Sequence, residues 1–161
     1  MKTHFRSLIA GVSLFSVSGW ADADLSKLPP PSTTPGLTYA KDIKPLFEAS
    51  CIRCHGDEKQ KGDLRLDSLE AVLKGGEEGR ILVAGKSLES ALVVAVSGLD
   101  EETAMPPKRK PGKGGPGGPG GTRPAGAPPG GPGGPGGFTP PKPFTPEQVG
   151  LIRAWIDQGA K

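Results

Sequence analysis

About a third of the way along the chain, residues 51–55 read Cys51-Ile-Arg-Cys54-His55, directly after the stretch YAKDIKPLFEAS at 39–50. These are the only two cysteines in the sequence. Two cysteines at this spacing, followed at once by a histidine, form the attachment signature of haem c. The two thiols can reach the two vinyl groups on one porphyrin edge while the imidazole swings beneath the iron. The motif therefore predicts one covalent haem c, with His55 as an iron ligand.

Other interpretations of the five-residue motif fit less well. A thioredoxin-type redox pair expects a βαβ context, which the surrounding sequence does not indicate. A zinc site needs four ligands, and the two cysteines and one nearby histidine leave that set incomplete. A chance match is the remaining alternative.

The pattern around the motif is helical, with no stretch that alternates convincingly enough for a strand. Predicted helices run from Ile43 to about Ala49 with Asp42 as cap, from Asp67 to Gly75 with a capping-box spacing to Glu70, from Ser87 to Gly98, and from Thr145 to Gly159. We expect Leu88 on the buried stripe of the third helix, Phe47 and Trp155 in helix or haem packing, and Tyr39 at the surface. The fold class is all-α, a small class I cytochrome c-like domain around one haem.

Composition divides the chain into segments. Residues 1–23 have a basic start, a short apolar run and an Ala-Asp-Ala ending, which indicate a signal peptide. Residues 24–37 are rich in Pro, Ser and Thr and predict a flexible spacer. The cytochrome c domain spans 38–161 and is interrupted at 106–143, where 14 Gly and 13 Pro among 38 residues predict a disordered linker.

Export sets the expected compartment. A signal peptide places the protein in the periplasm or elsewhere outside the cytoplasm, and no remaining stretch is apolar enough for stable insertion into a membrane. Without residues 1–23, the chain has 18 basic and 16 acidic residues, so net charge indicates no particular partner and no nucleic acid. The linker itself holds six basic residues and no acidic one.

Several segments together resemble one known family. YAKDIKPLFEASCIRCHGDEKQKGDLRLDS at 39–68, AGKSLESALVVAVSG at 84–98, AMPPK at 104–108 and FTPEQVGLIRAWIDQGAK at 144–161 resemble the cytochrome c-like domain common in planctomycete and verrucomicrobial proteins. The resemblance implies thioethers at Cys51 and Cys54, a proximal ligand at His55 and a distal ligand at Met105. The long Gly/Pro insertion after the Met-Pro-Pro motif departs from the family pattern.

The residues themselves also point to Met105. His4 would leave with the signal peptide and Met1 is the initiator, so the mature chain keeps one histidine, His55, and one methionine, Met105. Two prolines follow Met105 and stiffen its loop. An ordinary apolar role for Met105, ligation by Lys108 and an open sixth position are the alternatives.

A haem with both axial positions filled transfers electrons, so we expect an electron carrier with protein redox partners, its donor and acceptor unknown, and no enzyme activity. A haem enzyme or gas-binding haem protein would need a labile sixth ligand. A haem module tethered to its partner through the basic linker is the third hypothesis.

Overall fold

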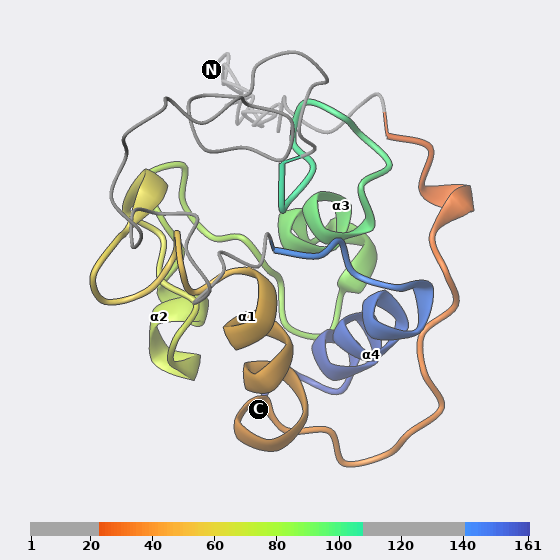
Figure 1. Cartoon of the computed structure of the whole chain (residues 1–161). Coiled ribbons are helices and arrows are strands. Elements are labelled where there is room, and N and C mark those ends of the chain that lie inside the picture. Colours follow the sequence, from red (N-terminus) through yellow and green to blue (C-terminus); the bar gives the residue numbers. More distant parts are fainter. Residues whose placement is uncertain (1–22, 108–140) are drawn as a thin grey trace, which may run out of the picture.

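The computed structural model describes residues 23–107 and 141–161, and within these two ranges the protein is helical (Figure 1). The α-helices are α1 (Lys44–Ser50), α2 (Leu69–Lys74), α3 (Ala91–Ser97) and α4 (Pro146–Asp157). A π-helical turn, Tyr39–Ile43, leads into α1, and 3-10 turns lie at Leu25–Lys27, Lys61–Asp63 and Ser87–Glu89. No strand occurs in the described ranges, and the predicted all-α fold is confirmed.

The core gathers around α4. Trp155, Ile152 and Ile156 on this helix are completely buried, because its apolar residues recur at helical spacing. They pack with the π-helical turn and α1 on one side and with α3 on the other, as Figure 1 shows. Ile43 and Phe47 contribute fully buried side chains from the α1 side, and Val93 does so from α3. The last helix therefore holds the first and third helices together.

The beginning of α4 follows its sequence closely. The Thr145 hydroxyl accepts a hydrogen bond from the Gln148 amide at 3.3 Å, and the Gln148 side chain accepts one from the Thr145 amide at 2.9 Å. Pro146 occupies the first turn, and Gly159 follows the helix with a φ of 101°. This reciprocal capping box satisfies two amides that the helix itself leaves unpaired. The predicted bounds of α4 are confirmed to within two residues.

Two predicted caps were wrong. The Asp42 carboxylate accepts a hydrogen bond from the Thr38 amide at 2.8 Å and so belongs to the π-helical turn, while α1 begins without a side-chain cap. Ser68, rather than Asp67, caps α2 by accepting from the Ala71 amide at 3.2 Å. Asp67 instead accepts two hydrogen bonds from Arg65, which draws its carboxylate away from the start of the helix.

The third helix also differs from its prediction. Residues 87–89 form a 3-10 turn, and α3 begins only at Ala91. The Leu88 side chain is 53% exposed, so its predicted place on the buried stripe was wrong. Leu92, Val93 and Val96 are buried as expected, and the helix ends at Gly98 in the left-handed conformation with a φ of 63°. A 3-10 turn has about 3.0 residues per turn, which rotates Leu88 off the face that α3 buries.

Residues 24–37, which we call the N-terminal strap, lie along α4 (Figure 1). Leu28 and Leu37 in this strap belong to the core, and the Ser32 amide donates to the Gly150 carbonyl at 2.9 Å. Any Cβ at position 150 would lie 2.8 Å from the Pro30 carbonyl oxygen, so glycine permits the close approach. This packed path differs from the flexible spacer expected from composition, because its two buried leucines are too far apart to give a periodic signal.

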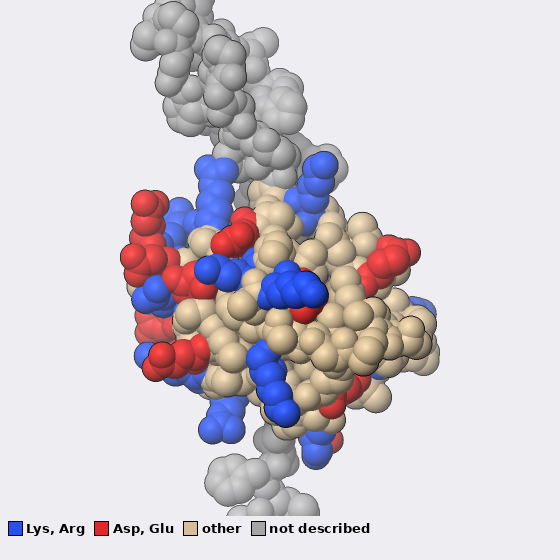
Figure 2. Space-filling model, turned by 90° about the horizontal axis from the view of Figure 1, so that it is seen from below, with Lys and Arg blue, Asp and Glu red and all other residues tan. Residues whose placement is uncertain are grey.

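Charge is distributed unevenly over the described surface. The segment 57–80, which contains α2, holds twelve acidic and basic side chains, whereas residues 28–40 hold none. Figure 2 shows the charged side chains crowded on the side of α2 and a largely uncharged surface on the opposite side, where the strap lies. Within the described ranges, no helix is long and apolar enough to cross a membrane. Residues 1–22 and 108–140 lie outside these ranges, so the predicted signal peptide and most of the predicted linker remain predictions.

Candidate haem-binding site

The motif Cys51-x-x-Cys54-His55 forms a tight turn at the end of α1. The Cys51 amide continues the helix by donating to the Phe47 carbonyl at 2.7 Å. The Cys51 carbonyl then accepts from both the Cys54 amide at 2.9 Å and the His55 amide at 3.0 Å. These two hydrogen bonds fold the motif back on itself. The structure therefore brings Cys51, Cys54 and His55 together, as their spacing predicted.

The chain that follows the motif returns to support it. The Lys61 amide donates to the Cys54 carbonyl at 3.0 Å, and the Leu66 amide donates to the His55 carbonyl at 2.7 Å. Gly56 makes the first bend possible, because a Cβ there would lie 2.5 Å from the Ile52 carbonyl oxygen. The backbone carbonyls of both Cys54 and His55 are thus held by later residues, and their positions do not depend on α1 alone.

The glycine pair at 75–76 allows a second turn to pack against the chain that follows the motif. A Cβ on Gly76 would lie 2.4 Å from the Gly62 carbonyl oxygen, and a Cβ on Gly75 would lie 2.1 Å from the Gly79 carbonyl oxygen. The Glu77 amide donates to the Gly62 carbonyl at 2.8 Å. The turn after α2 therefore lies directly against the segment that supports the motif, which explains the two adjacent glycines.

The two thiols are free and differ in burial. Cys51 is buried, and Cys54 is partly exposed. Burial, and then the neighbouring Cys54, raise the pKa of the Cys51 thiol to about 12. A thiol with so high a pKa is protonated at neutral pH. In the described residues, no three His, Cys, Asp or Glu side chains gather as a metal-binding group. The donor set thus fits thioether attachment better than zinc.

His55 presents a neutral imidazole with an unsatisfied nitrogen. Burial lowers the pKa of His55, and the nearby backbone groups of Lys61 and Leu64 offset part of that decrease. Neither of them forms a hydrogen bond to Nδ1. Nδ1 is the one buried side-chain nitrogen or oxygen without a hydrogen-bond partner among the described residues. The neutral form is the one that binds metal ions. An imidazole beside two thiols fits the His ligand of a covalently held haem.

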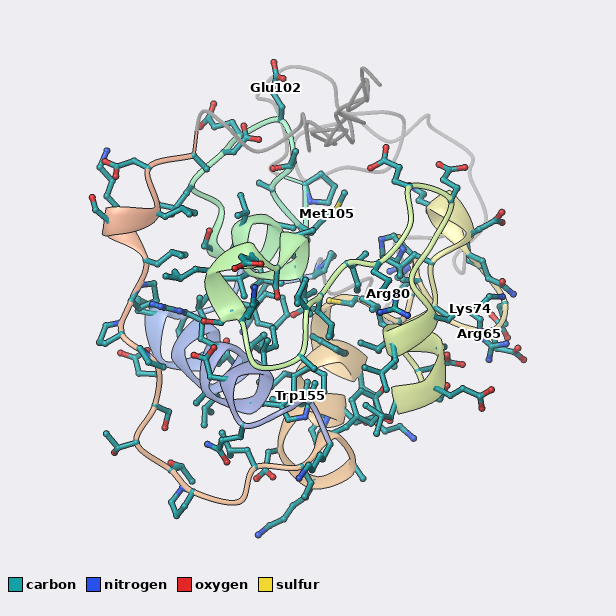
Figure 3. All side chains as sticks on the ribbon, turned by 180° about the vertical axis from the view of Figure 1, so that it is seen from behind. Arg65, Lys74, Arg80, Glu102, Met105 and Trp155 are labelled. Atoms are coloured by element: carbon teal, nitrogen blue, oxygen red, sulfur yellow. The ribbon has the colours of Figure 1, made fainter. Side chains whose placement is uncertain are left out.

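Met105 lies on the loop that follows α3. Its amide donates to the Ala95 carbonyl at 2.8 Å, which ties the loop to the helix, and its side chain is 41% exposed. Figure 3 places Met105 with Glu102, on the side of the molecule away from Trp155. Asp100 shapes this loop by accepting from the Thr103 hydroxyl at 2.7 Å. The expected ligand therefore sits on an anchored loop with its thioether accessible.

Tyr39 was expected at the surface, and that prediction was wrong. Its side chain is only 5% exposed, and its hydroxyl donates to the Leu66 carbonyl at 2.8 Å. The ring packs between Phe47 and Trp155, with centroid distances of 6.3 and 6.1 Å. Phe47 and Trp155 are completely buried, in agreement with their predicted packing roles. The start of the motif segment YAKDI offered a signal, since Tyr39 and Ile43 are spaced as residues on one helical face.

The fold and this site together define a class: a small all-α domain of the cytochrome c type, with a Cys-x-x-Cys-His turn at the end of its first helix. Residues 51–109 match the model of a protein family described as planctomycete cytochrome C. This match confirms, over residues 51–109, the resemblance noted in the sequence. Comparison with curated proteins gives no significant match, and neither does comparison with solved structures.

Proposed function

We propose that this protein is an exported monohaem c-type cytochrome that carries single electrons between protein redox partners. The observation that carries the proposal is the cluster of the Cys51 thiol, the Cys54 thiol and the His55 imidazole on one folded turn. The match to planctomycete cytochrome C over residues 51–109 supports it, because that family implies covalent haem c.

Each residue has a distinct role in the proposal. Cys51 and Cys54 would hold the haem through thioethers, and His55 would bind its iron. Met105 would provide a second iron ligand from the loop tied to α3. Bound haem iron supplies a reversible one-electron step, and methionine ligation raises its reduction potential. The chain's own part is to hold four donor groups in place and to keep small ligands away.

A filled sixth position makes an electron carrier the better-supported function, with no enzyme activity of its own. Redox partners of this kind meet through small and transient interfaces, which commonly bury less than about 1,200 Å². The predicted signal peptide supports a periplasmic or other exported location. Its donor and acceptor are proteins that also work outside the cytoplasm.

The exposure of Met105 favours a second candidate function. Met105 is 41% exposed, and a ligand carried by a loop can leave the iron more readily than one held within a helix. A labile sixth ligand would open the iron to small molecules, as a gas-binding haem protein or haem enzyme requires. Carbon monoxide separates the two functions, because it binds rapidly to reduced haem only where the sixth position opens.

The central test is covalent attachment in protein exported together with a haem c maturation system. We expect the protein to keep one haem per chain through acid-acetone extraction and denaturing electrophoresis. Cys51→Ala and Cys54→Ala should each lower the yield of haem protein sharply, whereas Ile52→Val, which keeps the motif, should not. Haem that is lost from wild-type protein on denaturation would contradict the proposal.

A further inference from the structure

A chain of backbone and side-chain hydrogen bonds connects the C-terminal part of the fold to His55. The Tyr39 hydroxyl donates to the Leu66 carbonyl at 2.8 Å, and the Leu66 amide donates to the His55 carbonyl at 2.7 Å. Both polar groups of the Leu66 backbone are therefore used, one toward Tyr39 and one toward the motif. Leu66 is 3% exposed, so water does not replace either bond easily.

Tyr39 is itself held firmly. Its amide donates to the Lys161 carbonyl at 2.7 Å, and that carbonyl also accepts from the Trp155 indole Nε1 at 2.9 Å. The aromatic rings of Phe47 and Trp155 flank its ring. The hydroxyl thus extends from a fixed base in the core, and Figure 3 shows Trp155 at that base. A donor held in this way can fix the position of the atom that it binds.

The Tyr39 hydroxyl also keeps its proton, and so remains a hydrogen-bond donor, at physiological pH. Burial, followed by the negative charges of Asp67 and Glu48, raises the pKa of Tyr39 to about 12, so the proton stays in place at any physiological pH. A buried carbonyl that loses its donor costs more free energy than a hydrogen bond between exposed groups. Removing the hydroxyl alone therefore leaves the Leu66 carbonyl unsatisfied and loosens the segment that supports His55.

We infer that Tyr39 is a positioning residue that acts through Leu66 to fix the backbone of His55. It touches neither the proposed haem nor its thioethers. The redox consequence of this inference rests on the proposed function, because it requires His55 to be an iron ligand. The structural consequence does not rest on the proposed function, since it concerns only the hydrogen bond between the Leu66 amide and the His55 carbonyl.

The test compares Tyr39→Phe with Ser90→Ala in full-length haem-loaded protein. Ser90 is a matched control, because its buried hydroxyl also bridges two backbone groups, accepting from the Val83 amide at 3.0 Å and donating to the Lys86 carbonyl at 2.8 Å. Hydrogen exchange measured by NMR reports the Leu66 amide. We expect Tyr39→Phe to speed its exchange about fivefold, as loss of one buried hydrogen bond implies, and Ser90→Ala to leave it within about twofold.

A spectroelectrochemical titration gives the second readout. Looser packing around a haem admits water, which stabilises the oxidised iron. We expect the ratio of reduced to oxidised Tyr39→Phe at a fixed potential to fall about threefold against wild type, and Ser90→Ala to be unchanged. Equal effects of the two variants on either readout would overturn the inference.

The wild-type protein provides a check that needs no variant. Its Leu66 amide should be strongly protected from exchange, and rapid exchange there would also overturn the inference. Loss of haem from wild type on denaturation would instead contradict the proposed function, while the exchange of Leu66 would still decide the role of Tyr39. The two failures are therefore distinguishable.

Discussion

At the scale of single residues, Met105 is the proposed iron ligand whose role depends most on its surroundings. A methionine thioether is a soft and polarisable group that packs well in cores, so a half-exposed methionine needs another reason for its place. Its backbone is fixed by the bond to Ala95, and the preceding Ala104 is buried. The loop is therefore anchored beside Met105 while the side chain remains free to bind.

Replacing Met105 by Ala should abolish the weak long-wavelength charge-transfer band of an iron–thioether bond, lower the reduction potential and allow rapid binding of carbon monoxide. Visible spectra of the oxidised protein and carbon monoxide mixing with the reduced protein measure these changes. Leu88→Ala is the control, since Leu88 is another exposed apolar side chain, at 53%. If Met105→Ala keeps the wild-type spectrum and potential, another group holds the sixth position.

The raised pKa of Tyr39 predicts a loss of stability at high pH. An unfolded tyrosine releases its proton near its ordinary value of 10.0, whereas the folded protein keeps this proton up to about pH 12. The contribution is thus fully present below pH 10 and is lost as the pH rises through about 12. A shift of this size corresponds to about 2–3 kcal/mol.

Denaturant unfolding on either side of this window tests the prediction. Wild-type protein should lose more free energy of unfolding between about pH 9 and about pH 12 than Tyr39→Phe does, because the variant has no proton to release. Identical pH dependence in the two proteins would show that the titration of Tyr39 is not linked to folding.

At the scale of elements, the contact between the N-terminal strap and α4 carries a second group of bonds. Arg153, which is only 8% exposed, donates to the Pro29 carbonyl, and the Gln158 side chain donates to the Thr34 carbonyl at 2.8 Å. Asp157 accepts from the amide and hydroxyl of Ser87 at 2.8 and 2.9 Å. Polar side chains of α4 therefore hold the strap and the 3-10 turn before α3 to the same helix.

Gly150→Val should displace the strap, because its Cβ would lie 2.8 Å from the Pro30 carbonyl oxygen. We expect a loss of about 2–3 kcal/mol in the free energy of unfolding, from overpacking and from the disturbed bonds of Ser32 and Arg153. Glu147→Val places the same side chain on an exposed position of α4 and should cost less than about 1 kcal/mol. Equal losses in the two variants would show that the strap contributes nothing through this contact.

Features that depend on residues close together in the sequence were predicted, and features that depend on residues far apart in the sequence were missed. The start of α4 was predicted because Thr145 and Gln148 cap one another within a single turn. The turn that joins Cys51 to His55 was likewise implied by spacing. The cap of α2 was missed because Arg65 withdraws Asp67, and the burial of Tyr39 depends on Leu66, 27 residues away. The strap depends on Arg153, at a separation of 124 residues, which no local pattern shows.

At the scale of the whole molecule, the Gly/Pro-rich linker joins two parts that are each secured at its borders. Before it, the Met105 amide is bound to Ala95, and near its end the Lys142 carbonyl accepts from the Ser50 hydroxyl at 3.0 Å. Ser50 is the last residue of α1. The folded domain on either side of the linker is thus connected through its own contacts.

We predict that a short Gly-Ser link in place of residues 112–137 leaves haem spectrum, reduction potential and folding essentially unchanged. The entropy of closing a loop grows only logarithmically with its length, so shortening the linker changes the free energy of unfolding by only about 1 kcal/mol. Visible spectra, redox titration and thermal unfolding of the deletion protein check this. Slower reduction by an acidic partner, most marked at low salt, would indicate instead that the six basic residues steer that partner.

The strap and the last helix also set the order in which the chain can assemble. Residues near the two ends meet directly, since Tyr39 binds the Lys161 carbonyl and Pro29 binds Arg153, and such contacts of high sequence separation form slowly. Neither can form until the final helix is in place. Under the proposed function, Cys51, which is buried in the folded protein, stays accessible for haem attachment until then. The long reach of these contacts thus allows attachment to precede closure.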